Sequence, residues 1–255
     1  MTLPPTARTH PGAHNPLAAE VAVALTYNGS TEAVLMATPA DLEDFAYGFS
    51  LTEGLARREE IERVEIVPTE LGIDVQLWVH EAVAARLAAR RRARVGPVGC
   101  GLCGIETLAE AMRQLPGIAP GGPSLSRADI EAAMEALSAA QPIREVTRAT
   151  HAAGFWSPGR GLVAVREDVG RHNALDKLAG ALRGAEPREG AVLMTSRISL
   201  DLVQKCTVLG APILIGVSAP TAAAAEAAEA AGLTLVAPAR TSRLEVLTGA
   251  ARITG

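Results

Sequence analysis

The sequence predicts an α/β protein in which a smaller N-terminal α/β portion precedes a larger α/β domain. The chain has 255 residues, of which 48% are hydrophobic, and this is enough to bury a sizeable core. Asn28-Gly29 stands between two apolar runs and indicates a β-hairpin, because both residues accept the positive φ angles of a type I′ turn. From about residue 146, short apolar runs alternate with longer helical ones, as in strands joined by crossover helices.

The N-terminal portion is expected to span residues 19–94. The 18 residues before it contain four prolines and no apolar run, so residues 1–18 are predicted to be a disordered tail rather than a signal peptide. After the hairpin, Thr38 is the expected N-cap and Pro39 the first residue of a helix with apolar residues at helical spacing. The other elements expected here are two strands and an arginine-rich helix, at 61–67, 73–79 and 81–94.

The C-terminal half is predicted to contain a mainly parallel sheet with right-handed crossovers. Two helices come first, at 105–115 and 126–139. The predicted strands are 161–166, 191–195, 213–217 and 233–237. The helices between them are 168–184, 198–209 and 220–231. An additional strand near 146–156 is expected to pair back through the Ser157-Pro158-Gly159 turn.

Polar segments follow each of these four strands. They are REDVGRHN (166–173), TSRIS (195–199), SAPT (218–221) and PARTSR (238–243). Ligands of open α/β sheets bind outside the carboxyl ends of the strands, where N–H groups at helix starts favour anions. Helix capping alone would explain Asp168, Thr195 and Ser218. It would not explain the arginines Arg166, Arg171, Arg197, Arg240 and Arg243, so the sequence predicts a composite site for an anionic, phosphorylated ligand.

Asp168, His172 and Asp176 recur every four residues and are predicted to share one side of a helix. Two carboxylates beside an imidazole could make it a general acid or base. A solvated helix face with an ion pair fits the spacing equally well. His151 is expected to be structural, and Lys205 either solvated or facing the anion site.

Cys100 and Cys103 stand in the glycine-flanked segment VGCGLCG. As a zinc half-site they lack a second pair, and the H-x-E of a zinc deaminase is missing. As a redox motif they lack the thioredoxin context. The glycines, the nearby arginines and a following helix would favour a mobile thiolate that carries a group. The spacing alone leaves all three alternatives open, whereas Cys206 is predicted to be an inert core thiol.

The overall composition excludes several classes of protein. A net charge of −4 and 3% aromatic residues argue against a nucleic-acid binder. The longest apolar stretch, 211–239, is interrupted by prolines and glutamates, so no membrane span is expected. Three cysteines are too few for a disulfide scaffold, which predicts a reducing, cytoplasmic setting.

A series of motifs runs in order through nearly the whole chain after residue 28. They are TPADLEDFAYGFSLTEG, GCGLCG, THAAG, EDVGRHNALDK, SRIS, GAPILIGVSAPT and GLTLVAPAR. With these motifs the chain resembles the formate dehydrogenase accessory sulfurtransferases, the FdhD/NarQ family.

The resemblance implies sulfur transfer. Members of the family take sulfur from a cysteine desulfurase as a cysteine persulfide and pass it to the molybdenum bis(molybdopterin guanine dinucleotide) cofactor, which the formate dehydrogenase apoenzyme needs. By motif, Cys100 corresponds to the persulfide cysteine and Cys103 to its partner. The cofactor-contact segment corresponds to Pro238, Ala239, Arg240, Thr241, Ser242 and Arg243. The other residues expected to orient the cofactor are Asp168, Arg171, His172, Asn173, Arg197 and Ser218.

The resemblance also implies an architecture. Residues 105–255 are expected to form a three-layer α/β/α domain similar to cytidine deaminases but without a zinc site or other catalytic metal, preceded by a mobile cysteine loop at 95–104. A homodimer is expected. The sequence departs from the family at three places where the family usually has glycine. Gly-Gly is replaced by Arg148-Ala149, a single glycine by Ser196, and Gly-Phe by Ala237-Pro238. These replacements are expected to alter the geometry of the ligand site and not the fold. The rival functions are a cofactor-binding chaperone with structural cysteines and a structural zinc protein.

Overall fold

The structure is a computed structural model that describes residues 5–94, 115–182, 186–240 and 243–254. In the N-terminal half, four strands form a sheet in the order β4-β3-β6-β5. They are β3 (Val21–Tyr27), β4 (Ser30–Ala37), β5 (Ile61–Pro68) and β6 (Ile73–Val79). Asn28 and Gly29 have φ angles of 44° and 81°, and β3 pairs antiparallel with β4. The predicted hairpin and both predicted strands are therefore confirmed.

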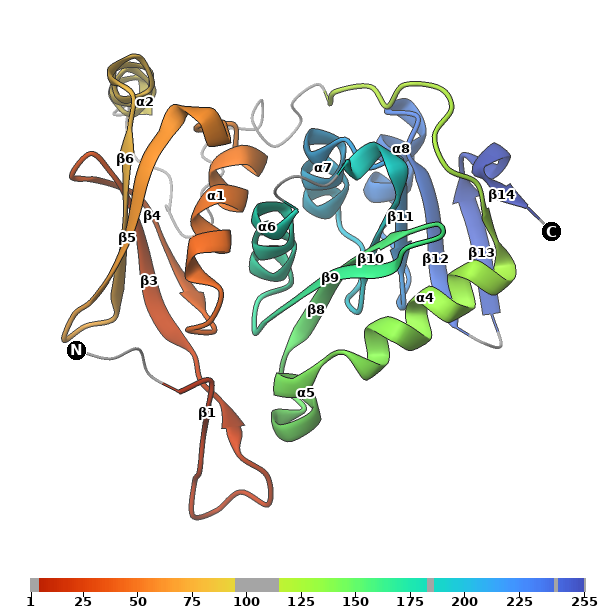
Figure 1. The fold of residues 1–255 in the computed structure, drawn as a ribbon, viewed down its shortest axis with the longest axis horizontal. Helices are drawn as coiled ribbons and strands as arrows, with labels where there is room; N and C mark the ends of the chain where they lie inside the picture. Colours follow the sequence, from red (N-terminus) through yellow and green to blue (C-terminus); the bar gives the residue numbers. More distant parts are fainter. Residues whose placement is uncertain (1–4, 95–114, 183–185, 241–242, 255) are drawn as a thin grey trace.

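Helices α1 (Leu42–Thr52) and α2 (Glu81–Arg94) complete this half (Figure 1). The prediction of α2 is confirmed. The start predicted for α1 is wrong, because Thr38 is not its N-cap and Pro39 is not its first residue. Instead, Thr38 lies against the C-terminal half: its N–H donates to Asp168 at 3.0 Å, and its Oγ1 accepts from the N–H of Val169 at 3.1 Å.

The C-terminal half contains a six-stranded sheet in the order β13-β12-β11-β10-β8-β9. Its strands are β8 (His151–Ser157), β9 (Gly161–Asp168), β10 (Ala191–Met194), β11 (Ile213–Gly216), β12 (Thr234–Arg240) and β13 (Arg243–Thr248). The four predicted strands are confirmed, and so is the additional one, which is β8 and forms a hairpin with β9.

The mainly parallel arrangement predicted for this sheet is wrong. In the described sheet, β10–β11 and β11–β12 are parallel, whereas β8–β9, β8–β10 and β12–β13 are antiparallel. The alternation of strands and helices indicates crossovers, which impose parallel pairing. It does not reveal that hairpins flank the parallel centre on both sides.

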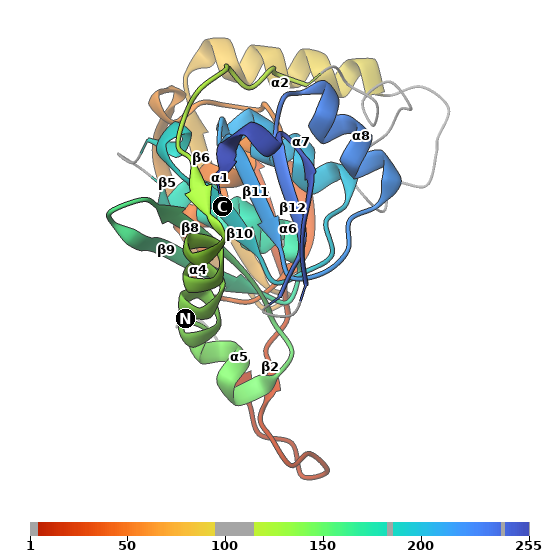
Figure 2. The same cartoon turned by 90° about the vertical axis from the view of Figure 1, so that its right-hand side faces the viewer.

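Helices cover both faces of this sheet (Figures 1 and 2). On one face lie α6 (Arg171–Ala181), α7 (Leu200–Leu209) and α8 (Ala222–Ala230), and on the other lies α4 (Arg127–Ala139). Each face buries its own apolar cluster, one around Phe155 and Leu175 and one around Leu137 and Ile215. This half therefore has the expected three-layer α/β/α arrangement. The helix predicted over 105–115 falls outside the described residues except for its last position.

Shorter elements complete the described chain. They are α5 (Pro142–Thr147), β7 (Leu125–Ser126), β14 (Ile253–Thr254) and 3-10 turns at Arg58–Glu60, Pro187–Glu189 and Ala250–Arg252. None of the helices within these ranges is long and apolar enough to cross a lipid bilayer.

The N-terminal segment differs from the disordered tail that its composition predicts. In its described part, β1 (Ala7–Arg8) pairs antiparallel with β2 (Leu17–Ala18), and the N–H of Ala19 donates to the carbonyl of Thr6 at 2.8 Å. The resulting hairpin projects below the body in Figure 1. Backbone pairing orders it without an apolar core, which is why composition does not reveal it.

The two halves meet where α1 packs against α6. Glycines occupy the closest approach: a Cβ atom on Gly48 would lie 1.6 Å from the carbonyl oxygen of Asp176, and one on Gly180 would lie 1.9 Å from that of Asp44. Since real Cβ atoms do not approach a carbonyl oxygen this closely, only glycine allows this packing. The contact fixes α6, and with it the turn between β9 and α6, relative to the N-terminal half.

Candidate functional site

The polar junctions predicted from the sequence lie at one edge of the six-stranded sheet. Strands β10, β11 and β12 are parallel, and β9 runs with them because β8 separates it from β10 by two antiparallel pairings. Their carboxyl ends face the lower end of the molecule in Figure 1. Strands β9 and β12 are four positions apart in the sheet order, or about 19 Å. We call the residues that follow these ends the carboxyl edge: 168–173, 195–199, 218–221 and 238–240.

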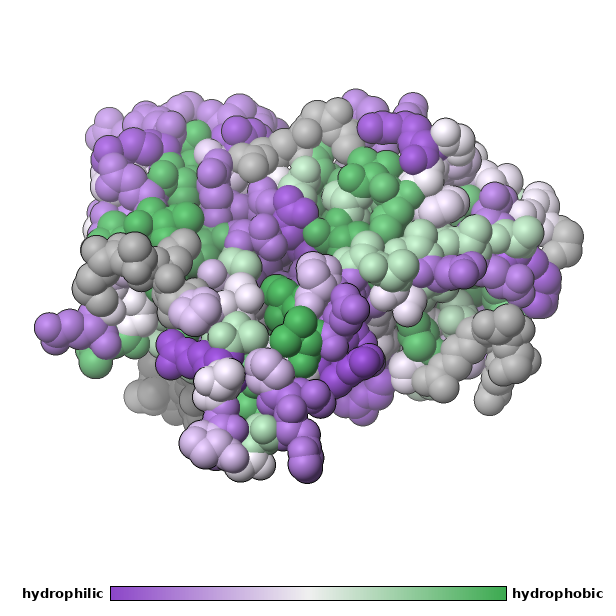
Figure 3. Space-filling model, turned by 60° about the horizontal axis from the view of Figure 1, so that its bottom comes forward, coloured by the Kyte–Doolittle hydropathy of each residue, from purple (hydrophilic) through white to green (hydrophobic). Residues whose placement is uncertain are grey.

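Figure 3 brings this end of the molecule forward. Hydrophilic and apolar side chains are interleaved there. The apolar side chains do not form one continuous surface. This distribution suits a polar ligand better than an apolar one.

Asp168 and Asn173 are used within the fold. The Asp168 carboxylate is fully buried and accepts from the N–H groups of Thr38 at 3.0 Å and Gly170 at 2.7 Å. It also accepts from Nδ2 of Asn173 at 3.0 Å and lies 2.6 Å from Nζ of Lys177. Asn173 Nδ2 donates in addition to a carbonyl of β4 at 2.9 Å. These two predicted cofactor-binding residues therefore hold the turn between β9 and α6 through contacts within the protein.

Asp168, His172 and Asp176 do not form the acid–base array that their spacing predicts. Asp168 is the last residue of β9, and α6 begins three residues later, so only the other two share a helix face. Nε2 of His172 lies 3.6 Å from Oδ2 of Asp201 on α7. Oδ1 of Asp176 lies 2.9 Å from Nζ of Lys205, which is also on α7. Each residue of the predicted array thus has a different partner.

Lys205 points into the protein and is neither solvated nor directed at the carboxyl edge. Its Nζ also donates to Glu53 at 2.5 Å and to Thr52 at 3.0 Å, both at the end of α1. Burial alone would lower its pKa, but the carboxylates of Asp176 and Glu53 raise it. Lys205 is therefore a charged link between α1, α6 and α7.

The arginines predicted at this site are of two kinds. Arg166 belongs to the contact between the halves, since its Nε and Nη2 donate to Asp44 at 2.8 and 2.6 Å. The Arg171 guanidinium forms no hydrogen bond or ion pair with any residue that the structure describes, and its Nε is buried without a partner. Arg197 is exposed in the loop after β10. A buried donor without an acceptor is costly, so Arg171 is the side chain here that most needs an added anion.

Two histidines flank Arg171 and are uncharged. Burial, and then the charge of Arg171, lowers the pKa of His172 to about 4, and its Nε2 is buried without a hydrogen-bond partner among the described residues. Burial, then Arg171 and Arg144, also lowers the pKa of His151. Imidazoles that are neutral at pH 7 can donate to or accept from a ligand. A pKa this low makes His172 a poor general acid or base near neutral pH.

The remaining predicted residues extend the edge toward β13. Ser218 follows β11 and is partly buried. The last residue of β12 that pairs with β11 is Val236, so Pro238 and Ala239 project beyond that strand, after a cis Ala237–Pro238 peptide bond. Arg240 ends β12 and Arg243 begins β13. Four predicted site residues lie outside the described residues: Cys100, Cys103, Thr241 and Ser242.

The predicted role of Cys206 is confirmed. The residue is fully buried in α7, and burial raises the pKa of its thiol to about 12. Because the thiolate is the reactive form, Cys206 is inert at neutral pH. The chain described on either side of the Cys100–Cys103 segment stops at Arg94 and resumes at Leu115, at the end of the molecule away from the carboxyl edge (Figure 1).

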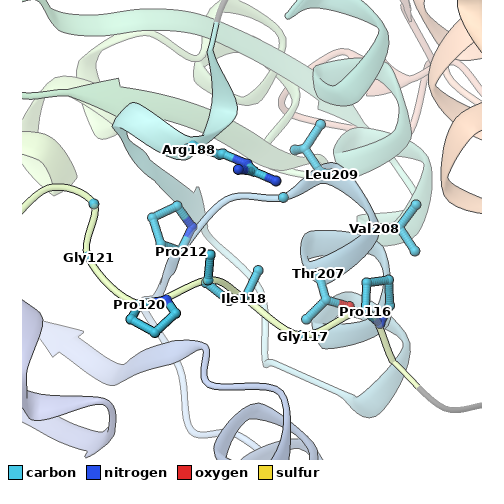
Figure 4. A pocket seen from close by; sticks show the side chains of 13 residues that line it. Pro116, Gly117, Ile118, Pro120, Gly121, Arg188, Thr207, Val208, Leu209 and Pro212 are labelled. Carbon is cyan, nitrogen blue, oxygen red and sulfur yellow. The ribbon is translucent and has the colours of Figure 1, made fainter.

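A pocket of about 350 Å³ lies beside the segment Pro116–Gly122, at the amino end of β11 (Figure 4). Arg188, Thr207 and Pro212 line it together with proline and glycine residues of that segment. It contains no carboxylate or imidazole in its described lining, so it offers no acid–base pair. In the described ranges, no group of three or more His, Cys, Asp or Glu side chains is placed to hold a metal ion.

Sequence reasoning missed three residues of this region. Thr38 and Lys177 hold Asp168, and Arg144 lies beside His151. The sequence does indicate that Lys177 is unusual, because it is one of only two lysines in the chain and lies in an apolar stretch. Thr38 contacts a residue 130 positions away, and no local pattern reveals such a contact.

Comparison with known proteins identifies the family. Residues 18–254 match the model of the FdhD/NarQ family. The sulfur carrier protein FdhD of Agrobacterium fabrum is 54% identical over 237 residues, which cover 92% of this chain and 88% of that protein. The protein of the same name from Bordetella petrii is 50% identical over 224 residues, covering 86% and 80%.

A solved structure agrees with this result. The crystal structure of a putative formate dehydrogenase accessory protein from Desulfotalea psychrophila is similar, with a TM-score of 0.75 and 27% identity, and the match covers 99% of each chain. The motifs, the fold and the relatives point to the same family, and the chain belongs to the FdhD/NarQ family.

Proposed function

We propose that this protein is a sulfur carrier that receives sulfur from a cysteine desulfurase as a persulfide on Cys100. It would deliver this sulfur to the molybdenum bis(molybdopterin guanine dinucleotide) cofactor for formate dehydrogenase. Relatives at 50% and 54% identity are named sulfur carrier protein FdhD. The observation that carries the proposal is the carboxyl edge, where the Arg171 guanidinium has no partner among the described residues.

The first step is a thiol exchange that needs no oxidant. The Cys100 thiolate attacks the outer sulfur of the persulfide on the desulfurase. One S–S bond forms on Cys100 while one breaks on the desulfurase, whose cysteine leaves as a thiolate. The glycines and arginines around the pair in the sequence favour the thiolate that this step requires.

The second step releases the sulfur. Attack of the Cys103 thiolate on the inner sulfur of the Cys100 persulfide forms a Cys100–Cys103 disulfide, and hydrosulfide leaves toward the cofactor. A cellular dithiol must then reduce this disulfide before the next cycle. Cys103 thus supplies the electrons that turn persulfide sulfur into sulfide.

The carboxyl edge would hold the cofactor, which is the substrate of this reaction. Guanidinium groups such as those of Arg171 and Arg197 bind phosphate oxygens through two parallel hydrogen bonds. The neutral imidazole of His172 and the hydroxyl of Ser218 can add further hydrogen bonds. The described ends of the cysteine segment lie away from this edge (Figure 1). Delivery therefore requires the segment to approach the edge of its own chain or that of a second copy, and the expected homodimer would supply the second route.

The carrier step is tested with cysteine variants in a strain that lacks its own copy of the gene. Cys100→Ser should lose the adduct of about 32 Da that mass spectrometry detects after incubation with a cysteine desulfurase and cysteine. It should also lose activation of formate dehydrogenase. Cys206→Ala is the matched control and should keep both, since that thiol is buried and protonated. If a Cys100→Ser, Cys103→Ser double variant still activates formate dehydrogenase, the protein is a cofactor-binding chaperone and the proposal is wrong.

A further inference from the structure

Three basic side chains from different elements lie near the β9 end of the carboxyl edge. They are Arg144 of α5, His151 at the start of β8 and Arg171 at the start of α6. His151 pairs with Asp168 in the β8–β9 hairpin, and α6 begins three residues after Asp168. Both arginines lie close enough to His151 for their charges to act on it.

Arg144 is fixed in this position by the fold. Its backbone N–H donates to Oε1 of Glu167 at 2.8 Å, and the Thr150 hydroxyl donates to the same oxygen at 2.9 Å. Its Nη1 donates to the Thr150 carbonyl at 3.1 Å. The guanidinium is thereby held next to His151, and it forms no ion pair with a described carboxylate.

Arg171 adds a second guanidinium that the protein does not neutralise. Its Nε is buried without a hydrogen-bond partner among the described residues. The nearest acidic side chain in sequence, Asp168, is fully buried and already accepts from backbone N–H groups, Asn173 and Lys177. Asp168 therefore does not act as the counter-ion of Arg171.

His151 is half-buried, and the charges of both arginines act on it. Burial and then the charges of Arg171 and Arg144 lower its pKa, against a smaller opposing effect of Asp168. A neutral imidazole can donate one hydrogen bond to an oxyanion. Two guanidinium groups and one imidazole match a group with several charged oxygens better than a single carboxylate.

We propose that Arg144, His151 and Arg171 form a binding subsite for a diphosphate group. The subsite rests on the proposed function, because a guanine dinucleotide contains such a diphosphate. It adds two residues to those expected to hold the substrate: Arg144, which lies outside the family motifs, and His151, which lies in the THAAG motif and was expected to be structural. It lies about 19 Å from the β12 end of the edge, so a ligand that also reaches residues 238–240 must extend along the sheet.

The subsite is tested on the full-length protein by NMR of the histidine ring C–H groups, with His151 assigned from a His151→Asn variant. Titration between about pH 5 and pH 8 is carried out with and without about 10 mM inorganic pyrophosphate. Bound pyrophosphate should raise the pKa of His151 toward its ordinary value, because an anion stabilises the imidazolium. Guanosine, which has no phosphate, should leave it unchanged. An unchanged pKa with pyrophosphate, or an equal change with guanosine, would overturn the subsite.

Calorimetry supplies the second readout. Arg144→Gln and Arg171→Gln should each weaken pyrophosphate binding about tenfold. Arg160→Gln, at the other end of the same β8–β9 hairpin, is the matched control and should bind as the wild type does. Equal weakening by the control would show that only overall charge matters. These assays involve no cysteine. The subsite can therefore be correct even if the carrier step is wrong, and the carrier step can be correct even if the subsite is wrong.

Discussion

Basic side chains occur in two regions of this protein with different surroundings. Where the two halves meet, Arg166, Lys177 and Lys205 each contact a carboxylate, at 2.6 to 2.9 Å. At the β9 end of the carboxyl edge, Arg171 and the neighbouring Arg144 form no ion pair with any described residue. The first group stabilises the fold by satisfying buried charges. The second is not neutralised by any described acidic side chain, and under the proposed function its positive charge is the part that a ligand would meet.

The use of lysine sharpens this contrast. The chain contains only two lysines, and both are buried between the halves, with 0% and 6% of their surface exposed. Lysine is ordinarily a surface residue. Every exposed basic side chain other than histidine is therefore an arginine, which is also the residue that binds phosphate oxygens in pairs.

The largest effect is expected from Lys177→Met. The substitution leaves the Asp168 carboxylate fully buried without its ion-pair partner at 2.6 Å. Breaking a buried pair from one side should lower the free energy of unfolding by about 3–5 kcal/mol. Urea denaturation measures this change, with Arg160→Gln as an exposed control that should stay within about 0.5 kcal/mol. A loss below about 1 kcal/mol would mean that this lysine is not structural.

A smaller effect is expected from His172 as pH falls. Its folded-state pKa of about 4 lies below the ordinary value of 6.5, so the unfolded chain binds more protons between these values. The stability that the neutral imidazole contributes is complete above about pH 6.5 and is lost as pH falls toward 4. With 38% of the side chain exposed, screening reduces the loss at pH 5 to about 1 kcal/mol.

His172→Gln should remove this contribution. The difference in unfolding free energy between pH 7 and pH 5 should then be about 1 kcal/mol smaller than in the wild type. Denaturation curves at the two pH values give the difference directly, and other titrating groups cancel because both proteins contain them. The same loss in both proteins would show that His172 is not held neutral by the fold.

Local patterns predicted the fold well where the physics is local. The Asn28-Gly29 hairpin follows from the φ angles of two residues, and the helices of the C-terminal half follow from apolar spacing. The acid–base array failed because α6 begins at Arg171. The last residue of the preceding strand, Asp168, therefore cannot lie on its face. The number of parallel strand pairs was overestimated because β8 is inserted between β9 and β10. Only long-range pairing decides that strand order.

The sequence predicted that the polar junctions share one edge of the sheet, but not the contacts that their side chains make. The direction of β9 to β12 places the polar junctions on one edge, as the topology of α/β sheets predicts. Which side chains remain available depends on contacts between distant segments. Asp168 is occupied by Thr38 of the other half, and Arg166 by Asp44. Arg171, with an equally polar setting in the sequence, has no such partner within residues 5–94, 115–182, 186–240 and 243–254.

The most direct test of this contrast is the formate dehydrogenase activity that Arg171→Gln supports in a strain without its own copy, normalised to folded protein. We expect at least about a tenfold loss of activity, while the free energy of unfolding stays within about 0.5 kcal/mol of the wild type. Arg166→Gln should behave in the opposite way, with a lower unfolding free energy and full activity per folded molecule. Full activity of Arg171→Gln, or a loss that only follows unfolding, would show that Arg171 does not bind the ligand.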